Sequence, residues 1–295
     1  MNLSTGKSLG ATPALHWLMG SAHVYECETR SVLRINQMGM ENLIRTVVKV
    51  QVLDRMTEAG GYVVRVQVLH TEQSQQQGLH QLIAALNLVG DVLEIEVSRL
   101  GYAQRILNRR ELLDKWPGVR AGLYQKFKDI PQTEVLLAGL DQQLVTPGAL
   151  ETAILPNGLY GLLFAGLLGR PFVFQPSELP ESRILARFFG NQDLPLLVRK
   201  HAELPEGIAN DYVRIVAISQ LDDDAFDATS WRRLLRQITD TPTLDTTLYV
   251  TSNDAYELAT AGGVLRTASQ YLRVQVPQVY HNELTHRLTL QPAQL

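Results

Sequence analysis

The sequence predicts an α+β protein in which a large curved antiparallel sheet has helices covering its apolar face. Three segments with nearly the same sequence lead to this prediction: VVKVQVL at 47–53, VVRVQVL at 63–69 and YLRVQVP at 271–277. Each alternates apolar with polar or charged residues, which is the period of a strand with one buried and one wet face. Strands buried on one face only favour an antiparallel sheet over a parallel one.

The first half of the chain reads as successive strands joined by turns. We expect strands over 24–35, 43–53, 62–70 and 92–97, with a turn near Gly39 and a hairpin loop over 54–61. The alternation also predicts which side chains lie on the wet face, where opposite charges can pair across strands. These are Lys49, Gln51, Arg65, Gln67, Arg273 and Gln275, beside the acids Glu94 and Glu96.

Four segments have the apolar spacing of helices that cover a sheet. They are 79–88, 111–116, 181–189 and 230–238. Asn108 is the expected N-cap of the second helix, and Pro117 is expected to end or kink it. The acids Asp222 to Asp224 precede the fourth helix and are expected to cap it.

Strand patterns return in the last third of the chain. They begin near Leu196, and a four-strand run is expected over 247–252, 255–260, 264–276 and 284–290. Gly262 and Gly263 are the natural turn between the second and third of these strands.

These patterns divide the chain into four parts. We expect a flexible N-terminus over 1–20, a strand-rich N-terminal lobe over 21–130 and a Gly/Pro-rich helical connection over 131–195. A strand-rich C-terminal lobe follows over 196–295, and it could form one continuous domain with the N-terminal lobe.

Composition places the chain among ordinary globular proteins. Hydrophobic residues make up 45%, charged residues 19%, and the formal net charge is −3, which gives no basic surface for nucleic acid. The single cysteine, Cys27, excludes an internal disulfide framework. The most apolar stretch, 158–169, is shorter than the roughly 20 residues that cross a bilayer. We therefore expect no transmembrane segment and a cytoplasmic location.

Three short strings resemble functional motifs but lack the required spacing. His281 and His286 in HNELTH are five residues apart, whereas a helical zinc site needs histidines at i and i+4. Consecutive Asp222 to Asp224 do not reproduce the alternating ligands of a calcium loop. Gly6 to Ser8 lacks the strand and the first glycine of a phosphate loop. We predict no catalytic residue, no cofactor and no metal.

The run GLYGLLFAGLLG is the one candidate contact surface for an apolar ligand or a partner. Its apolar side chains have helical spacing, which is also typical of a packed core, and its glycines permit close approach of another chain. The candidate residues are Leu159, Leu162, Leu163, Phe164 and Leu167.

Two segments carry a recurring form in which a strand ends in a Gly-containing turn and leads into another strand or a helix. They are VLEIEVSRLGYAQRILNRRELLDKW and DAYELATAGGVLRTASQYLRVQV. In this the chain resembles bacterial lipoprotein-carrier-like and lipovitellin-like proteins, whose curved antiparallel sheets wrap helices or an apolar ligand. The resemblance covers the strand-rich two-thirds of the chain and transfers no functional residue.

Function is predicted only at the level of class. The first expectation is a non-enzymatic, cytoplasmic protein-binding or assembly module that presents a broad β-sheet surface to a protein partner. The alternative is a binder of a lipid or other apolar small molecule in a cavity between sheet and helices. The third is an enzyme without a recognisable motif.

Overall fold

The computed structural model describes residues 11–56, 60–75, 78–87, 90–174, 179–189, 192–203, 211–240 and 247–292 of the 295-residue chain. One antiparallel sheet of eleven strands dominates it, in the order β5-β4-β3-β2-β1-β11-β10-β9-β8-β7-β6. The strands are β1 (Ala22–Ile35), β2 (Met38–Arg55), β3 (Tyr62–Gln73), β4 (Val92–Val97), β5 (Ala103–Ile106), β6 (Glu181–Phe189), β7 (Gln192–Glu203), β8 (Tyr212–Leu221), β9 (Tyr249–Ala259), β10 (Leu265–Val276) and β11 (Tyr280–Leu290).

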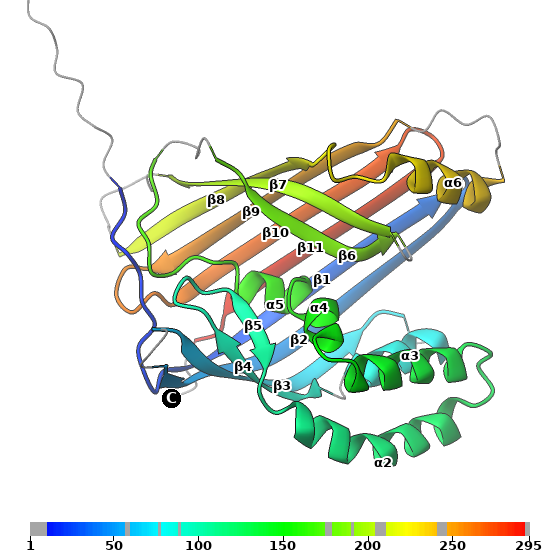
Figure 1. The fold of residues 1–295 in the computed structure, drawn as a ribbon, viewed down its shortest axis with the longest axis horizontal. Helices are drawn as coiled ribbons and strands as arrows, with labels where there is room; N and C mark the ends of the chain where they lie inside the picture. The colour runs from blue at the N-terminus through cyan, green and yellow to red at the C-terminus, as the bar shows by residue number, and fades with distance from the viewer. Residues whose placement is uncertain are drawn as a thin grey trace, which may run out of the picture.

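The first and last strands join the two strand-rich regions. β1 pairs along its length with β11, from Tyr25 opposite Leu290 to Ile35 opposite Tyr280. The early and late parts of the chain therefore lie side by side in one sheet, as Figure 1 shows. The predicted α+β class with a large antiparallel sheet is confirmed.

The predicted division between wet and buried faces also holds. Val48, Val64 and Val66 are fully buried on the inner face of the sheet. On the outer face, Arg65 on β3 donates to Glu94 on β4, with 2.6 Å between Nη2 and Oε1. Period-two alternation therefore determines the face on which each of these side chains lies.

The sheet curls so that its edge strand β6 lies over its own inner face. Arg183 on β6 reaches Asp254 on β9, although two strands separate them in the sheet. Farther along β6, the ring centroid of Phe189 lies 5.8 Å from that of Tyr280 on β11. Figure 1 shows β6 crossing in front of these strands. Strand twist accumulates over many strands and produces such curling.

Within the described residues, six helices accompany the sheet. They are α1 (Gly78–Asn87), α2 (Arg109–Phe127), α3 (Thr133–Val145), α4 (Ala149–Ile154), α5 (Gly158–Leu163) and α6 (Ala228–Thr239). Helix α5 contacts β10 and β11 on the inner face, while α6 packs Trp231 against Phe189 and Tyr280 at one end of the sheet (Figure 1). No helix in the described part of the chain is long and apolar enough to span a bilayer.

The helix predicted over 181–189 is wrong, because this segment is strand β6. Its apolar residues at 184, 185, 188 and 189 fit a helical stripe as well as a strand. Pairing with β7 decides the outcome, since Arg183 lies opposite Leu196 and Leu185 opposite Leu194. Long-range pairing thus overrides a local pattern.

The second predicted helix is longer than expected. Helix α2 continues through Pro117 to Phe127, although an interior proline removes one helical hydrogen bond. Side chains on both sides of Pro117 hold the helix, because Trp116 is buried and Arg120 donates to Asp141 of α3 at 3.0 Å. Asn108 stands at the N-cap position without a capping side-chain bond, and instead donates to the Val92 carbonyl.

Three boundaries in the last third also differ from the prediction. The two strands expected over 247–252 and 255–260 are one strand, β9, so the run has three strands. The strand expected over 284–290 begins earlier, at Tyr280, after a turn in which Gln278 has a positive φ of 66°. The N-cap of α6 is Asp227, which accepts from the Ser230 amide, rather than the acids at 222–224. The Gly262–Gly263 turn is confirmed, with positive φ at both glycines.

The helices predicted over 79–88 and 230–238 are confirmed as α1 and α6, except that residue 88 lies outside the described residues. Residues 1–10 of the predicted flexible N-terminus also lie outside them. Farther along that segment, Leu15 is buried, and the Thr12 amide donates to the Phe172 carbonyl.

Candidate functional site

A row of polar side chains crosses the otherwise apolar inner face of the sheet. In the registers of neighbouring strands, Thr29 lies opposite His286, His286 opposite Gln270 and Gln270 opposite Asp254. Beyond Ala217 of β8 the row reaches Lys200 on β7. Directly opposite residues of antiparallel strands share a face, with Cβ atoms about 4.5–5.5 Å apart. We call Thr29, His286, Gln270, Asp254 and Lys200 the inner polar row.

Most of the inner polar row is removed from solvent. Asp254 is 3% exposed, His286 5% and Gln270 6%. A buried polar group costs free energy unless it is hydrogen-bonded, so these positions call for an explanation other than packing.

Two cavities lie over this row. The apolar cavity has a volume of about 790 Å³ and lies between the sheet and α3, α4 and α5. Its floor includes Gln270 and His286 of the inner polar row, and its walls are mostly apolar. Its apolar lining includes Leu140, Leu144, Leu150, Ile154, Leu159, Leu185, Leu272 and Leu284.

The polar cavity, about 510 Å³, lies beside it and contains Asp254 and Lys200 of the row. It is bounded by the other side of the α4–α5 segment and by the first residues of β6, including Glu181 and Arg183. Its polar lining also includes Tyr102, Tyr256 and Glu151, together with Gln104, Thr152 and Ser182.

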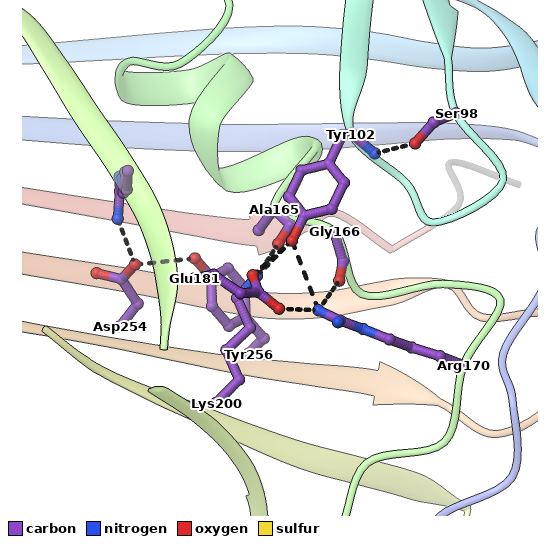
Figure 2. Close-up of polar contacts among 10 residues, drawn as sticks. Ser98, Tyr102, Ala165, Gly166, Arg170, Glu181, Lys200, Asp254 and Tyr256 are labelled. Carbon is purple, nitrogen blue, oxygen red and sulfur yellow. Dashed lines mark hydrogen bonds and ion pairs between the residues drawn. The ribbon is translucent and has the colours of Figure 1, made fainter. Parts of the chain in front are cut away.

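A cluster at the polar cavity joins the two edges of the curled sheet. Tyr102, next to β5, donates to Glu181, the first residue of β6, at 2.6 Å (Figure 2). Glu181 also accepts from Arg170 and, at 2.9 Å, from Lys200. Lys200 further donates to the Ala165 carbonyl at 2.7 Å. We call Tyr102, Arg170, Glu181 and Lys200 the edge latch, because it ties β5 to β6.

The electrostatics of the edge latch favour a fixed ion cluster. Burial alone would raise the pKa of Glu181, but the adjacent Lys200 charge and three donated hydrogen bonds lower it to about 2. Burial and the Glu181 carboxylate raise the pKa of Tyr102, so its hydroxyl keeps its proton as a donor. The arrangement stabilises the closure of the sheet and does not acidify Tyr102.

A second ion pair connects β6 with the inner polar row. Arg183 Nη1 donates to Asp254 Oδ2 at 2.8 Å, and the Tyr256 hydroxyl donates to the same oxygen at 3.1 Å. Figure 2 shows Tyr256 and Asp254 close to the edge latch. The other carboxylate oxygen, Asp254 Oδ1, is buried without a hydrogen-bond partner among the described residues.

His286 is the titratable group on the floor of the apolar cavity. Its Nδ1 lies 2.9 Å from the Thr29 hydroxyl. Burial, followed by the positive charge of Arg183, lowers its pKa to about 4, so the imidazole is neutral at physiological pH. The apolar cavity therefore has a polar but uncharged floor.

The structure distributes the five predicted contact residues over different surroundings. Leu159 lines the apolar cavity and Phe164 lines the polar cavity. Leu162, Leu163 and Leu167 are buried in the hydrophobic core. Of the five candidate residues, one therefore lines each cavity and three belong to the packed core.

Sequence reasoning missed the inner polar row, although a signal for it is present. Asp254 is an even number of residues from buried Tyr256 and Leu258 on β9, so the pattern places it on the same face. Gln270 has the same relation to buried Leu272 on β10. A polar residue in the buried phase of an amphipathic strand is the informative observation. The register that aligns these residues depends on pairing among strands distant in sequence.

The two histidines of HNELTH lie on opposite faces of β11, as their odd separation requires. His286 is on the inner face, whereas His281 Nε2 lies 3.7 Å from Glu283 on the outer face.

Asp222, the first of the three consecutive acids, accepts a hydrogen bond from the Ala225 amide in the turn before α6.

No protein-family model matches the chain, and no curated protein is similar to it in sequence. Its fold is similar to that of lipovitellin in a structure of lipid–protein interactions, with a TM-score of 0.47 and 12% identity. That match covers 94% of this chain but only 26% of lipovitellin, so the chain spans about a quarter of the length of this relative.

Two further solved structures have lower scores. DynF from the dynemicin biosynthesis pathway of Micromonospora chersina has a TM-score of 0.21 and 7% identity, covering 100% of this chain and 91% of that one. An outer membrane lipoprotein-sorting protein domain from Vibrio parahaemolyticus has a TM-score of 0.18 and 9% identity, covering 92% and 87%. The matches to lipovitellin and to the lipoprotein-sorting domain confirm the predicted weak resemblance in fold. No residue or activity is transferred from these proteins.

Proposed function

We propose that the protein binds a lipid or another apolar small molecule in the apolar cavity. The observation that carries this proposal is the cavity itself, with a volume of about 790 Å³ and a mostly apolar lining in which leucine is the commonest residue. Small-molecule sites typically measure about 300–1,000 Å³ and combine apolar walls with a few polar groups. An apolar ligand in this cavity would add dispersion contacts with the lining side chains and would remove apolar surface from water.

The elements around the cavity support a preformed site. Its floor is the centre of the sheet, where β10 and β11 are each paired on both sides. Its cover consists of α3, α4 and α5, and β6 closes one side through Leu185. A site on paired strands is held more rigidly than one on loops, which reduces the entropy lost on binding.

The adaptor role expected from the sequence depends on the outer face of the sheet. That face carries cross-strand ion pairs, such as Arg45 with Glu28 and Arg65 with Glu94. Such pairs suit contact with water as well as contact with a partner. The adaptor role and the cytoplasmic location therefore stay predictions, and the cavity is the stronger basis for a proposal.

The test uses N-phenyl-1-naphthylamine, an uncharged probe whose fluorescence rises in apolar surroundings. We expect saturable binding to the wild-type protein. The blocking variant is Gly139→Trp, because Gly139 of α3 lines the apolar cavity and an added Cβ meets no atom within 4 Å. The matched control is Gly122→Trp on α2. A Cβ added at Gly122 also meets no atom within 4 Å, and Gly122 lines neither cavity.

The two variants separate ligand binding from general effects of a new tryptophan. We expect Gly139→Trp to weaken probe binding about tenfold, equivalent to about 1.4 kcal/mol, and Gly122→Trp to leave it unchanged. Absence of saturable binding to the wild type, or equal binding by both variants, would overturn the proposal.

A further inference from the structure

Where the two cavities adjoin, the inner polar row contains two side chains with polar groups that have no hydrogen-bond partner among the described residues. We call this place the gap. At one end of the row, His286 is hydrogen-bonded to Thr29. At the other, Lys200 is fully engaged in the edge latch. Between them, the Gln270 side chain makes no hydrogen bond with the described residues, and Asp254 Oδ1 has no partner there.

These two groups are cross-strand neighbours, so the gap is one continuous feature. Gln270 on β10 lies directly opposite Asp254 on β9. Gln270 lines the apolar cavity and Asp254 the polar cavity. Each residue is more than nine-tenths buried, and Asp254 Oδ1 is a buried polar atom without a partner among the described residues, which is unfavourable. A ligand atom placed between them could satisfy both.

The cavities adjoin closely enough for one molecule to occupy both. Arg183 of the polar cavity and Leu185 of the apolar cavity are two residues apart on β6, and so lie on one face about 7 Å apart. On α5, a Cβ at Gly158 would lie 3.5 Å from His286 Cε1, and one at Gly161 would lie 4.0 Å from Arg183 Nη2. Helix α5 therefore passes close to both cavities, to His286 of the apolar cavity and to Arg183 of the polar cavity.

The charges around the gap determine which head group fits. The guanidinium of Arg183 is already paired with Asp254. Two buried carboxylate oxygens of the polar cavity, Asp254 Oδ1 and Glu151 Oε2, have no hydrogen-bond partner in the part of the chain that the structure describes. An anionic head would meet these oxygens as like charges, which is unfavourable where water is excluded. A hydroxyl or amide can donate to Asp254 Oδ1 and accept from the Gln270 amide.

From this geometry we infer that the ligand is a single-chain amphiphile with an uncharged hydroxyl or amide head. Its chain occupies the apolar cavity, and its head lies between Gln270 and Asp254. The inference rests on the proposed function and names the ligand class for the same site.

The test compares two ligands with the same chain and different heads. Dodecan-1-ol and dodecanoate compete with N-phenyl-1-naphthylamine at pH 8, where dodecanoate is an anion. We expect the alcohol to displace the probe at a concentration about tenfold lower. Equal or better displacement by dodecanoate would overturn the inference, whereas absence of probe binding to the wild type would overturn the proposed function itself.

Two variants locate the head group. Gln270→Leu removes the amide at similar size and should weaken alcohol binding several-fold while probe binding is kept. Asp254→Asn removes the negative charge and leaves Arg183 uncompensated, so it should shift the preference towards dodecanoate. The control is Ser252→Ala, because Ser252 is buried on the same face of β9 and lines neither cavity.

Circular dichroism establishes that each variant is folded before binding is compared. Should Asp254→Asn fail to fold, Gln270→Leu decides the outcome alone. Unchanged alcohol affinity in folded Gln270→Leu would overturn the placement of the head, as would an equal loss in Ser252→Ala.

Discussion

Arg183 on the edge strand β6 is hydrogen-bonded to Asp254 on β9 across 2.8 Å, although β7 and β8 separate their strands in the sheet. The contact exists because the sheet curls until its edge lies over its inner face. The Asp254 side chain is 2% exposed and that of Arg183 18%. Their pairing therefore takes place largely out of water.

Replacing Arg183 should be strongly destabilising. Arg183→Met leaves the Asp254 carboxylate buried without its cation, and breaking a buried pair in this way costs about 3–5 kcal/mol. Urea unfolding followed by tryptophan fluorescence measures the loss. Arg214→Met is the control, since Arg214 pairs with Glu203 on the surface at 48% and 42% exposure, and such pairs contribute about 0–1 kcal/mol.

The double variant Arg183→Met with Asp254→Leu separates pairing from packing. Replacing both charges by apolar groups removes the desolvation penalty, so it should recover part of the loss. The argument fails if Arg183→Met costs no more than Arg214→Met.

The edge latch predicts a difference between two tyrosines. Tyr102→Phe removes a donor to the partly buried Glu181 carboxylate, and hydrogen bonds to charged groups contribute about 1.5–3 kcal/mol. We expect a loss near the lower limit, because Glu181 is 34% exposed. Tyr271→Phe removes a 3.1 Å hydrogen bond to Glu283 outside the latch and should cost less than about 0.5 kcal/mol. Equal losses in urea unfolding would show that the latch adds nothing.

Local alternation predicted most of the sheet but not its curling. Arg65 and Glu94 were predicted to share the wet face, because period two fixes the face of every residue in a strand. Strand β6 was missed because its apolar residues fit both periods, and only its pairing with β7 selects the strand.

The candidate site depends on information that no single segment contains. Asp254, Gln270 and His286 come from three strands, and only the register brings them into one row. The sequence does show polar residues at strand positions where the alternation predicts buried side chains. Their alignment, and the cavities above them, follow from the curled sheet and the helices on it.

The buried His286 predicts a pH dependence of stability. Its folded pKa of about 4 lies below the ordinary value of 6.5, so the unfolded chain binds a proton more readily between these values. Stability is therefore complete above pH 6.5 and falls as the pH decreases towards 4, by about 3 kcal/mol in total. Glu181 is protonated only at lower pH, since its pKa is about 2.

Urea unfolding at pH 7 and pH 4.5 checks this dependence. His286→Gln can keep a hydrogen bond to Thr29 without titrating, so its stability should change much less between the two pH values. His281→Gln on the outer face is the control and should behave like the wild type. A wild-type slope that survives in His286→Gln would assign the dependence to another group.

Pro117 predicts a stabilising substitution. It is exposed in the interior of α2, where proline is about 3 kcal/mol less favourable than alanine. Alanine gives the unfolded chain more freedom, which offsets about 0.4–1 kcal/mol of this gain. We therefore expect Pro117→Ala to raise the free energy of unfolding by about 2 kcal/mol. Pro131→Ala, in the exposed turn between α2 and α3, should be neutral or slightly destabilising, because that proline restricts only the unfolded chain. A loss of stability in Pro117→Ala would mean that a proline-induced bend is needed to bury Trp116 and to bring Arg120 to Asp141.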